Sequence, residues 1–311
     1  MKDSRKVFNV FLSPLKQLYL WLLEKRNYYV GLHNPKKRID EVHKEICGKP
    51  IDWENPTDLN EKINWLKVYT DTSLWSELAD KYGVRKYVEE KGFGSLLVPL
   101  YGYWTNVDDI DFGKLPDSFV LKDTHGSGNV IIVKDKNQLD EKKTRKRLRK
   151  WLKTRYGVSE GEVHYKDIVP GIIAEQLLED NHCSFSKSLV DYKVWSFDGE
   201  PYSVRVYYNR TADYVYIGQY DKEWNYHPEY SKFTNHFRDG KDTVPKPATL
   251  GMMLNAAAVL SKGFPEVRVD FYEVNGKLYF GEMTFTSSGG HMDSYTDDYL
   301  IELGNQTKLP L

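Results

Sequence analysis

VRVDFYEVNGKLYFGEMTF, residues 267–285, is the stretch that decides the fold of this chain. β-Branched and aromatic residues on both sides of Asn275-Gly276 predict a β-hairpin. One face of this hairpin is apolar and suits a core, and its residues are Val269, Phe271, Gly281, Met283 and Phe285. The opposite face carries charge. It is either a functional surface or an exposed polar face with salt bridges.

The charged face includes Asp270 and Glu282, which are candidate Mg²⁺ ligands because this ion prefers oxygen donors. A two-residue turn at Asn275-Gly276 would send these two carboxylates to opposite faces. A three-residue loop that includes Val274 would oppose Asp270 to Phe280. It would bring four side chains to one side: Arg268, Asp270, Glu282 and Thr284. The metal hypothesis therefore predicts the three-residue loop, and a tight turn without a compensating bulge would exclude a shared metal site.

A second candidate site precedes the hairpin, in SFVLKDTHGSGNVIIVKD (118–135). Two β-rich runs, Phe119–Lys122 and Val130–Val133, flank the loop His125-Gly126-Ser127-Gly128. Backbone N–H groups of such a loop can cradle phosphate oxygens, and Lys122 is a cation well placed for the same phosphates. The loop runs into a strand and lacks the Gly-Lys-Ser/Thr of a Walker A motif. An ordinary hairpin loop is an equally good interpretation.

The third candidate is IIAEQLLED (172–180), which predicts a buried strand that ends in acids. Backbone groups beside Glu175 suit the amino edge of adenine, and Glu179 or Asp180 suits a ribose hydroxyl. A strand end without special function is the alternative.

The rest of the chain predicts a mixed α+β protein with a helical N-terminal region. Asp58 and Glu61 form a capping box at the start of one helix. Further helices are predicted over 75–91, 140–156 and 249–262, and further strands over 191–197 and 202–208.

Two segments have open interpretations. VFNVFLSPLKQLYLWLL (7–23) is shorter than the ~20 apolar residues that span a bilayer, and no small-residue cleavage site follows it. It predicts either a buried helix or an amphipathic helix in peripheral contact with a membrane. The basic run KKTRKRLRK (142–150) is either a solvated helix face or a basic lip facing an acidic or phosphorylated substrate.

Composition narrows the class of protein. The 311 residues include 44 Lys+Arg and 45 Asp+Glu, and this balance argues against a nucleic-acid partner. A hydrophobic fraction of 40% excludes global disorder. Two cysteines, Cys47 and Cys183, cannot form a disulfide framework and indicate a reducing compartment. We expect a cytoplasmic protein, with the inner face of the membrane as the alternative location.

Five motifs in this order resemble the TupA-like ATP-grasp proteins, which are associated with bacterial cell-surface polysaccharide biosynthesis. The motifs are DKYGVRKYVEE (80–90), LPDSFVLKDTHGSGNVIIVKDK (115–136), IIAEQLLED (172–180), DYKVWSFDG (191–199) and FPEVRVDFYEVNGKLYFGEMTFTSSGG (264–290). The resemblance implies an α+β, ATP-grasp fold in which two lobes enclose ATP. The implied division is a helical N-terminal region (1–78), a connecting segment (79–117), a small lobe (118–176) and a large lobe with the metal hairpin (177–311).

The same resemblance implies the site residues. ATP is expected to contact Lys122, His125, Gly126, Ser127, Gly128, Glu175, Gln176, Leu177 and Lys193. Mg²⁺ is expected on Asp270 and Glu282. The ATP-grasp superfamily commonly has Asn two residues after this glutamate, so Thr284 is a third metal ligand by position only. The His125 side chain is either a phosphate donor or a structural group.

The implied reaction is carboxylate activation, in which ATP forms an acyl phosphate that an amine attacks to give an amide. Lys122, Lys193 and the loop N–H groups are expected to hold the phosphates in line, and Arg268, together with Arg205 or Arg210, is expected to stabilise the acyl phosphate and the tetrahedral intermediate. The expected carboxylate is a uronic acid, as a sugar or nucleotide sugar, of a capsular or cell-surface polysaccharide. The alternatives are a glycosyltransferase-like or sugar-kinase enzyme of the same pathway, and a non-catalytic polysaccharide-binding protein.

Overall fold

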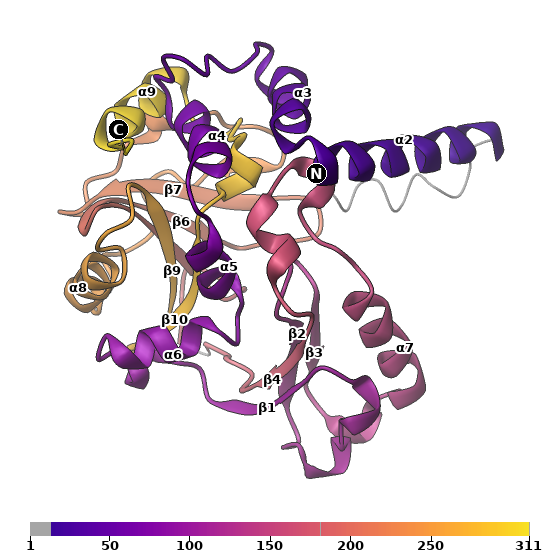
Figure 1. Cartoon of the computed structure of the whole chain (residues 1–311). Helices are drawn as coiled ribbons and strands as arrows, with labels where there is room; N and C mark the ends of the chain where they lie inside the picture. The colour runs from indigo at the N-terminus through magenta and orange to yellow at the C-terminus, as the bar shows by residue number, and fades with distance from the viewer. Residues whose placement is uncertain (1–13, 181, 311) are drawn as a thin grey trace.

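The computed structural model describes residues 14–180 and 182–310, so residues 7–13 of the apolar N-terminal stretch lie outside the described residues. Two β-sheets with helices packed on them form two lobes, which confirms the predicted α+β class (Figure 1). The helices are α2 (Pro14–His33), α3 (Pro35–Cys47), α4 (Leu59–Tyr69), α5 (Ser73–Ala79), α6 (Val84–Glu90), α7 (Glu141–Leu152), α8 (Leu250–Leu260) and α9 (Asp297–Gln306). The strands are β1 (Leu100–Trp104), β2 (Phe119–Asp123), β3 (Val130–Val133), β4 (Ile172–Glu175), β5 (Asp191–Phe197), β6 (Glu200–Tyr208), β7 (Val215–Asp221), β8 (Phe237–Asp239), β9 (Val267–Val274) and β10 (Lys277–Thr284).

The small lobe is an antiparallel sheet in the order β1-β4-β2-β3. Its outer face packs Leu121 against Leu148 and Trp151 of α7. Because side chains alternate along a strand, Lys122 and Glu175 lie on the other face. The strand β1 falls in the segment expected to be a connection, yet it pairs with β4 and belongs to this sheet.

The large lobe is a sheet in the order β10-β9-β5-β6-β7-β8, antiparallel except for the parallel pair β7–β8. One face packs Val194, Val206 and Phe271 against Met253 and Leu260 of α8 to form the main core. The opposite face of the sheet has two parts. The helices α4 and α9 cover one part through a second apolar cluster, and the other part carries the charged residues of the hairpin.

The N-terminal helices follow local sequence signals. The Asp58 side chain accepts a hydrogen bond from the Glu61 backbone at 2.9 Å, and the reciprocal contact completes the predicted capping box. The helix predicted over 75–91 is instead two short helices, α5 and α6, because the turn at 80–83 interrupts it.

The helix α2 projects from the body of the molecule (Figure 1). Its C-terminal part packs against the body at Gly31, where the backbones approach so closely that a Cβ atom would lie 1.8 Å from the Val158 carbonyl oxygen. Residues 14–26 are exposed, so the buried-helix interpretation is wrong for the described part of this segment. No helix of the described residues combines the length and apolar character needed to cross a bilayer.

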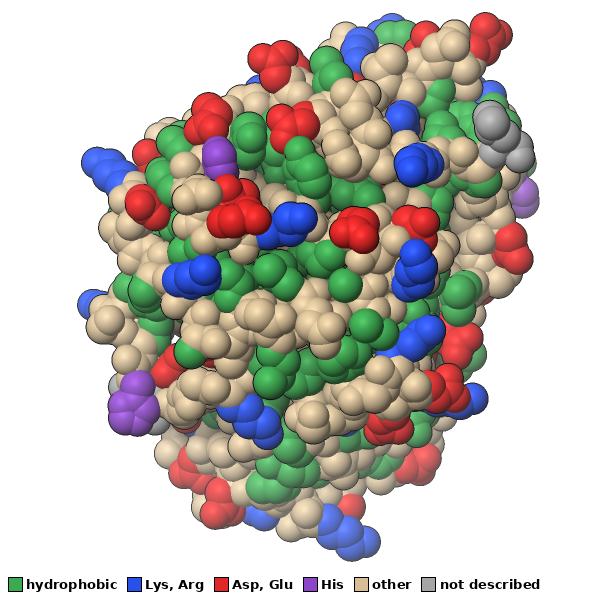
Figure 2. Space-filling model, turned by 90° about the vertical axis from the view of Figure 1, so that its left-hand side faces the viewer, with side chains coloured by type: hydrophobic (Ala, Val, Ile, Leu, Met, Phe, Trp, Pro, Cys, Tyr) green, Lys and Arg blue, Asp and Glu red, His purple; other side chains and the backbone are tan. Residues whose placement is uncertain are grey.

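The basic run of α7 contacts the small lobe itself. Arg145 donates to the backbone oxygens of Val107 and Ile110 at 2.7 and 2.8 Å, and Arg149 pairs with Asp108. Because α7 covers the outer face of the small sheet, these contacts favour the solvated helix face over the basic lip. Figure 2 shows acidic and basic side chains interspersed on one side of the molecule, in keeping with the balanced composition.

Candidate active site

The turn of the β9–β10 hairpin differs from the sequence prediction. Asn275 and Gly276 have φ of 52° and 74° and form a tight two-residue turn, so the expected three-residue loop is wrong. A β-bulge between Phe280 and Glu282 then shifts the register by one residue, and Asp270 lies directly opposite Glu282. The two carboxylates therefore share a face, through a bulge instead of a longer loop.

Gly281 makes this bulge possible. A Cβ atom on Gly281 would lie 2.9 Å from the Asp270 carbonyl oxygen and 3.2 Å from the Tyr272 ring. Only glycine fits there without displacing the neighbouring strand. Beyond the bulge, Thr284 pairs with Arg268, so all four predicted side chains project to one side.

Arg268 organises the acidic pair. Its guanidinium donates to both Asp270 oxygens at 2.7 and 2.8 Å, to Thr284 Oγ1 at 3.1 Å and to Glu282 Oε1 at 3.4 Å. Burial opposes the charged form of Arg268, but Asp270 and Glu282 outweigh it and raise the pKa of the guanidinium. Thr284 donates to Glu282 at 3.0 Å, so its hydroxyl supports the carboxylate in this structure.

Lys193 of β5 is the register partner of Asp270 and donates to its carboxylate. It also lies 2.8 Å from Asp191. Burial raises the pKa of Asp191, whereas burial of Asp270 is outweighed by Arg268 and Lys193, which lower the pKa of that carboxyl. The site thus holds a dense group of compensated charges in a largely buried setting.

The same row continues across the sheet to Arg205 on β6 and Gln219 on β7. Arg205 is only 1% exposed and stacks 4.0 Å from the Tyr295 ring. One guanidinium nitrogen donates to the Ser294 carbonyl at 3.2 Å, while Nε and Nη1 have no hydrogen-bond partner among the described residues. A buried cation without an anion beside it is unusual and points to an anionic ligand.

On the small lobe, Lys122 and Glu175 form an ion pair of 2.8 Å. Glu175 also accepts from Arg85 at 3.2 Å and is buried. Gln176 donates its backbone N–H to the Pro99 carbonyl at 2.9 Å, and Leu177 follows it, partly buried, where the chain leaves the small sheet. Lys122 is 25% exposed in its side chain and so keeps access to a ligand.

The loop 125–128 is the connection of the β2–β3 hairpin. His125 is 2% exposed, and its Nε2 lies 3.2 Å from the Trp151 carbonyl of α7. This placement favours the structural interpretation of its side chain. Lys81 donates to the Gly126 carbonyl, while Ser127 and Gly128 are exposed at the tip, where Gly128 has a φ of 78°.

Two tyrosines connect these parts into one site. Burial raises the pKa of Tyr272, and the charges of Asp191, Glu282, Asp270 and Glu175 raise it further, so carboxylates of both lobes surround one phenol. Tyr156 hydrogen-bonds Ser127 and is also within reach of the Glu282 charge. The groups that shift the pKa values of these two phenols therefore come from the loop, the small-lobe ion pair and the acidic hairpin.

Arg210 stands apart from these groups. Its side chain is 51% exposed, lies 3.9 Å from Asp191 and 5.5 Å from the Tyr207 ring, and is therefore peripheral to the hairpin.

Three residues were not selected from the sequence: Tyr272 in the site, and Lys67 and Glu162, which contact the segment that follows β10. Tyr272 could have been found, because it lies two residues after Asp270 on the same face of a strand. Lys67, which donates to the Gly289 carbonyl at 2.8 Å, resembled any surface lysine of a helix. Glu162 accepts from Thr286 at 2.6 Å, and its segment gave no periodic signal.

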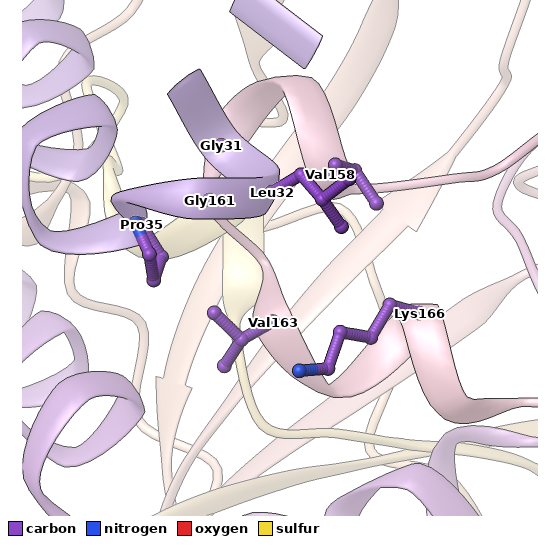
Figure 3. A pocket seen from close by; sticks show the side chains of 7 residues that line it. All are labelled: Gly31, Leu32, Pro35, Val158, Gly161, Val163 and Lys166. Carbon is purple, nitrogen blue, oxygen red and sulfur yellow. The ribbon is translucent and has the colours of Figure 1, made fainter. Parts of the chain in front are cut away.

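The donor set fits the groups that the sequence implied. Asp270 and Glu282 offer hard oxygen ligands on adjacent strands, and the Glu282 side chain is 40% exposed, which leaves room for a hydrated Mg²⁺. Lys122, Lys193 and the exposed loop tip offer cations and N–H groups suited to phosphates. A separate pocket lies between α2, α3 and the 158–166 segment (Figure 3), and its volume of about 20 Å³ is far too small for a nucleotide.

Comparisons with known proteins define the class. No curated protein matches the chain. Among solved structures, D-alanine–D-alanine ligase from Bacillus anthracis has 17% identity and a TM-score of 0.40, covering 74% of this chain and 67% of that chain. An L-amino acid ligase from Bacillus licheniformis has 14% identity and a TM-score of 0.42, covering 74% of this chain and 47% of that one.

The two lobes and the acidic hairpin define an ATP-grasp enzyme, the class of ligases that uses ATP with Mg²⁺. A model of the TupA-like ATP-grasp family matches residues 61–308, and the chain belongs to this family.

Proposed function

We propose that this ATP-grasp ligase joins a carboxylate to an amine through an acyl phosphate. We propose further that the carboxylate is a uronic acid unit or precursor of a cell-surface polysaccharide. The observation that supports the carboxylate substrate best is the Arg268–Arg205 pair of guanidinium groups on one sheet face, the second of them without an anionic partner. Guanidinium groups suit the planar, bidentate recognition of carboxylates and phosphates.

Each side chain has a role in this proposal. ATP with Mg²⁺ would supply the phosphoryl group and neutralise its charge, held by Asp270 and Glu282. Lys122, Lys193 and the 126–128 loop bind phosphate oxygens, and residues 175–177 form the wall next to adenine. Arg268 and Arg205 orient the substrate carboxylate and stabilise the acyl phosphate. Arg210, at the edge, is proposed to contact the sugar carboxylate before it enters.

The experiment combines ATP, Mg²⁺, a panel of nucleotide-activated uronic acids and a panel of amines. A substrate carboxylate labelled with ¹⁸O should transfer one labelled oxygen to the released phosphate, because the acyl phosphate breaks at the carbonyl carbon. A sugar kinase would leave the phosphoryl group on the product, and a glycosyltransferase would release a nucleoside diphosphate without consuming ATP. Either result would replace the proposed reaction with its alternative.

Substitutions connect the reaction to the site. Asp270→Asn and Glu282→Gln should each lower kcat at least 100-fold, because two carboxylates must share the charge of Mg²⁺. Asp117→Asn serves as the matched control, since its side chain is 87% exposed and lies outside the site. Unchanged turnover in the two site variants would contradict the mechanism.

We propose that α2 holds the enzyme at a membrane surface, where a lipid-linked polymer is made. Large apolar side chains are exposed along it, including Leu15 at 79%, Leu18 at 53% and Trp21 at 53%. Lys25 follows this apolar segment and suits anionic lipid headgroups, whereas Arg26 pairs with Glu41 of α3.

Sedimentation with vesicles tests the membrane contact. The full chain should sediment with vesicles that contain anionic lipid, and high salt should weaken the association. A Leu18→Ser/Trp21→Ser/Leu22→Ser variant should remain in the supernatant with its ligase activity intact. If both proteins behave alike, α2 does not contact the membrane.

A further inference from the structure

A cluster of metal-ligating side chains lies outside the nucleotide site. His43 and Cys47 are four residues apart on α3 and therefore face the same side of that helix. His291 reaches them from the segment that follows β10. The ligand atoms of the three residues all lie within 4.8 Å of one another, and both histidines are almost fully buried.

The distances fit a tetrahedral ion. His43 Nδ1 and His291 Nδ1 are 3.3 Å apart. Two nitrogens bound to Zn²⁺ at ~2.0–2.1 Å in tetrahedral geometry are separated by about 3.3 Å. In the same geometry a sulfur and a nitrogen ligand are separated by about 3.6 Å. The sulfur of Cys47 needs a shift of roughly 1 Å to reach this separation, and its half-buried side chain can make that shift.

The protein alone satisfies these two histidines poorly. A direct Nδ1–Nδ1 hydrogen bond uses one N–H group and one lone pair. It leaves both Nε2 atoms, which are buried, without a hydrogen-bond partner among the described residues. Zn²⁺ bound to both Nδ1 atoms would use both of the lone pairs that face each other, whereas the two Nε2 atoms would remain N–H donors without a partner among the described residues.

The surrounding residues hold the cluster in place. Asn60 of α4 donates to Cys47 Sγ at 3.9 Å and to the Met292 carbonyl at 3.1 Å, and it accepts from the Met292 N–H at 2.9 Å. One amide thus fixes both the thiol and the backbone next to His291. Such supporting contacts are typical of metal sites.

We propose that His43, Cys47 and His291 bind one Zn²⁺ ion, with a fourth position open to water. Two imidazoles and a thiolate are borderline-soft ligands, which favour Zn²⁺ over the Mg²⁺ of the nucleotide site. The ion would tie α3 to the segment that begins nine residues after Glu282. It would therefore fix the N-terminal helices to the loop that follows the acidic hairpin.

The test uses the full chain and two probes. The protein as purified should contain about one equivalent of zinc by elemental analysis. After zinc is removed, titration with Co²⁺ should produce the thiolate-to-metal charge-transfer band and the visible bands of a tetrahedral site. Zn²⁺ should displace these bands at one equivalent and raise the Tm.

Variants separate this site from others. Cys47→Ser should abolish the charge-transfer band and lower the bound zinc at least tenfold, whereas Cys183→Ser, which removes the other half-buried cysteine, should change neither. Asp270→Asn should also retain the band, because the nucleotide site has no thiol. If the wild-type chain gives no thiolate band and no rise in Tm with either metal, the proposal is wrong. That result needs no variant to fold.

Discussion

Arg205 is the residue whose environment departs furthest from what stability alone would select. Its guanidinium is buried against Tyr295 and Tyr207, with two nitrogens unpartnered among the described residues. Buried charges without partners cost stability, and they are retained where they bind or act.

Replacing this charge should separate stability from activity. Arg205→Met keeps most of the side-chain volume and removes the uncompensated cation, so we expect the free energy of unfolding to rise by about 1 kcal/mol. The KM for the carboxylate substrate should rise, while the affinity for ATP stays unchanged. Urea denaturation and steady-state kinetics measure both. A loss of stability would mean that the stacking on Tyr295 outweighs the burial of charge.

The role of a single residue was predictable where its chemical type and its spacing along a strand pointed to the same site. Asp270, Glu282 and Arg268 could be selected because charges alternate with apolar residues along a strand. Arg205 could be located on a predicted strand, but not its isolation, because burial of a charge depends on α9 and the 291–296 segment folding over it. The inward packing of His125 against α7 was not predictable, since a glycine-rich loop leaves both the phosphate-donor and the structural interpretation of its histidine open.

The β9–β10 hairpin is the element on which the site depends. Its alignment of carboxylates rests on the bulge at Gly281, where any Cβ atom would press against the Asp270 carbonyl. A substitution there acts on strand pairing and on ligand geometry together.

Gly281→Ala should therefore widen the β9–β10 pair at the bulge and lower Mg²⁺-dependent ATP affinity at least tenfold, with a Tm that falls by a few degrees. Calorimetric titration with Mg·ATP measures the first effect and thermal unfolding the second. Gly251→Ala on α8 is the control, because nothing lies within 4 Å of its Cβ position and a helix favours alanine. Equal ATP affinity in both variants would show that the bulge is dispensable.

Elements with strong local signals were predictable in position and type. The strands β2, β3, β5, β6, β9 and β10 and the helices α7 and α8 lie where periodicity and capping placed them. The bulge itself was not predictable, because a tight turn followed by a bulge and a longer loop without one place the same side chains on the same face of the hairpin. The strand β1 was missed because its sequence is short and only its pairing with β4 stabilises it.

At the scale of the whole molecule, buried histidines make stability depend on pH. Burial, followed by the charge of Lys67, lowers the pKa of His164 to about 3, and burial lowers the pKa of His291 to about 2. Both rings are neutral in the folded chain at neutral pH. Once unfolded, each ring gains a proton below its ordinary pKa of 6.5, which favours unfolding as the pH falls.

We therefore expect the free energy of unfolding to decrease between pH 6.5 and about 3, by about 1.4 kcal/mol per pH unit for His164 alone. Urea denaturation across this range measures the slope. A His164→Leu variant should lower the slope by one proton, whereas His33→Gln, at an exposed position, should leave it unchanged. Parallel pH curves for wild type and His164→Leu would contradict the assignment.

The Gly281 bulge also has an arithmetic consequence. In a hairpin with a two-residue tip and regular pairing, directly opposed residues are separated by an odd number of positions. Asp270 and Glu282 are twelve apart, an even number, so a tight Asn-Gly tip and a facing pair of this separation are compatible only if one strand carries an extra residue. The number of positions that separates two residues across a two-residue tip therefore tells, from a single sequence, whether their side chains can share a face without a bulge. An even count between two functional side chains signals a bulge, and a glycine on the way from the tip marks where to look for it.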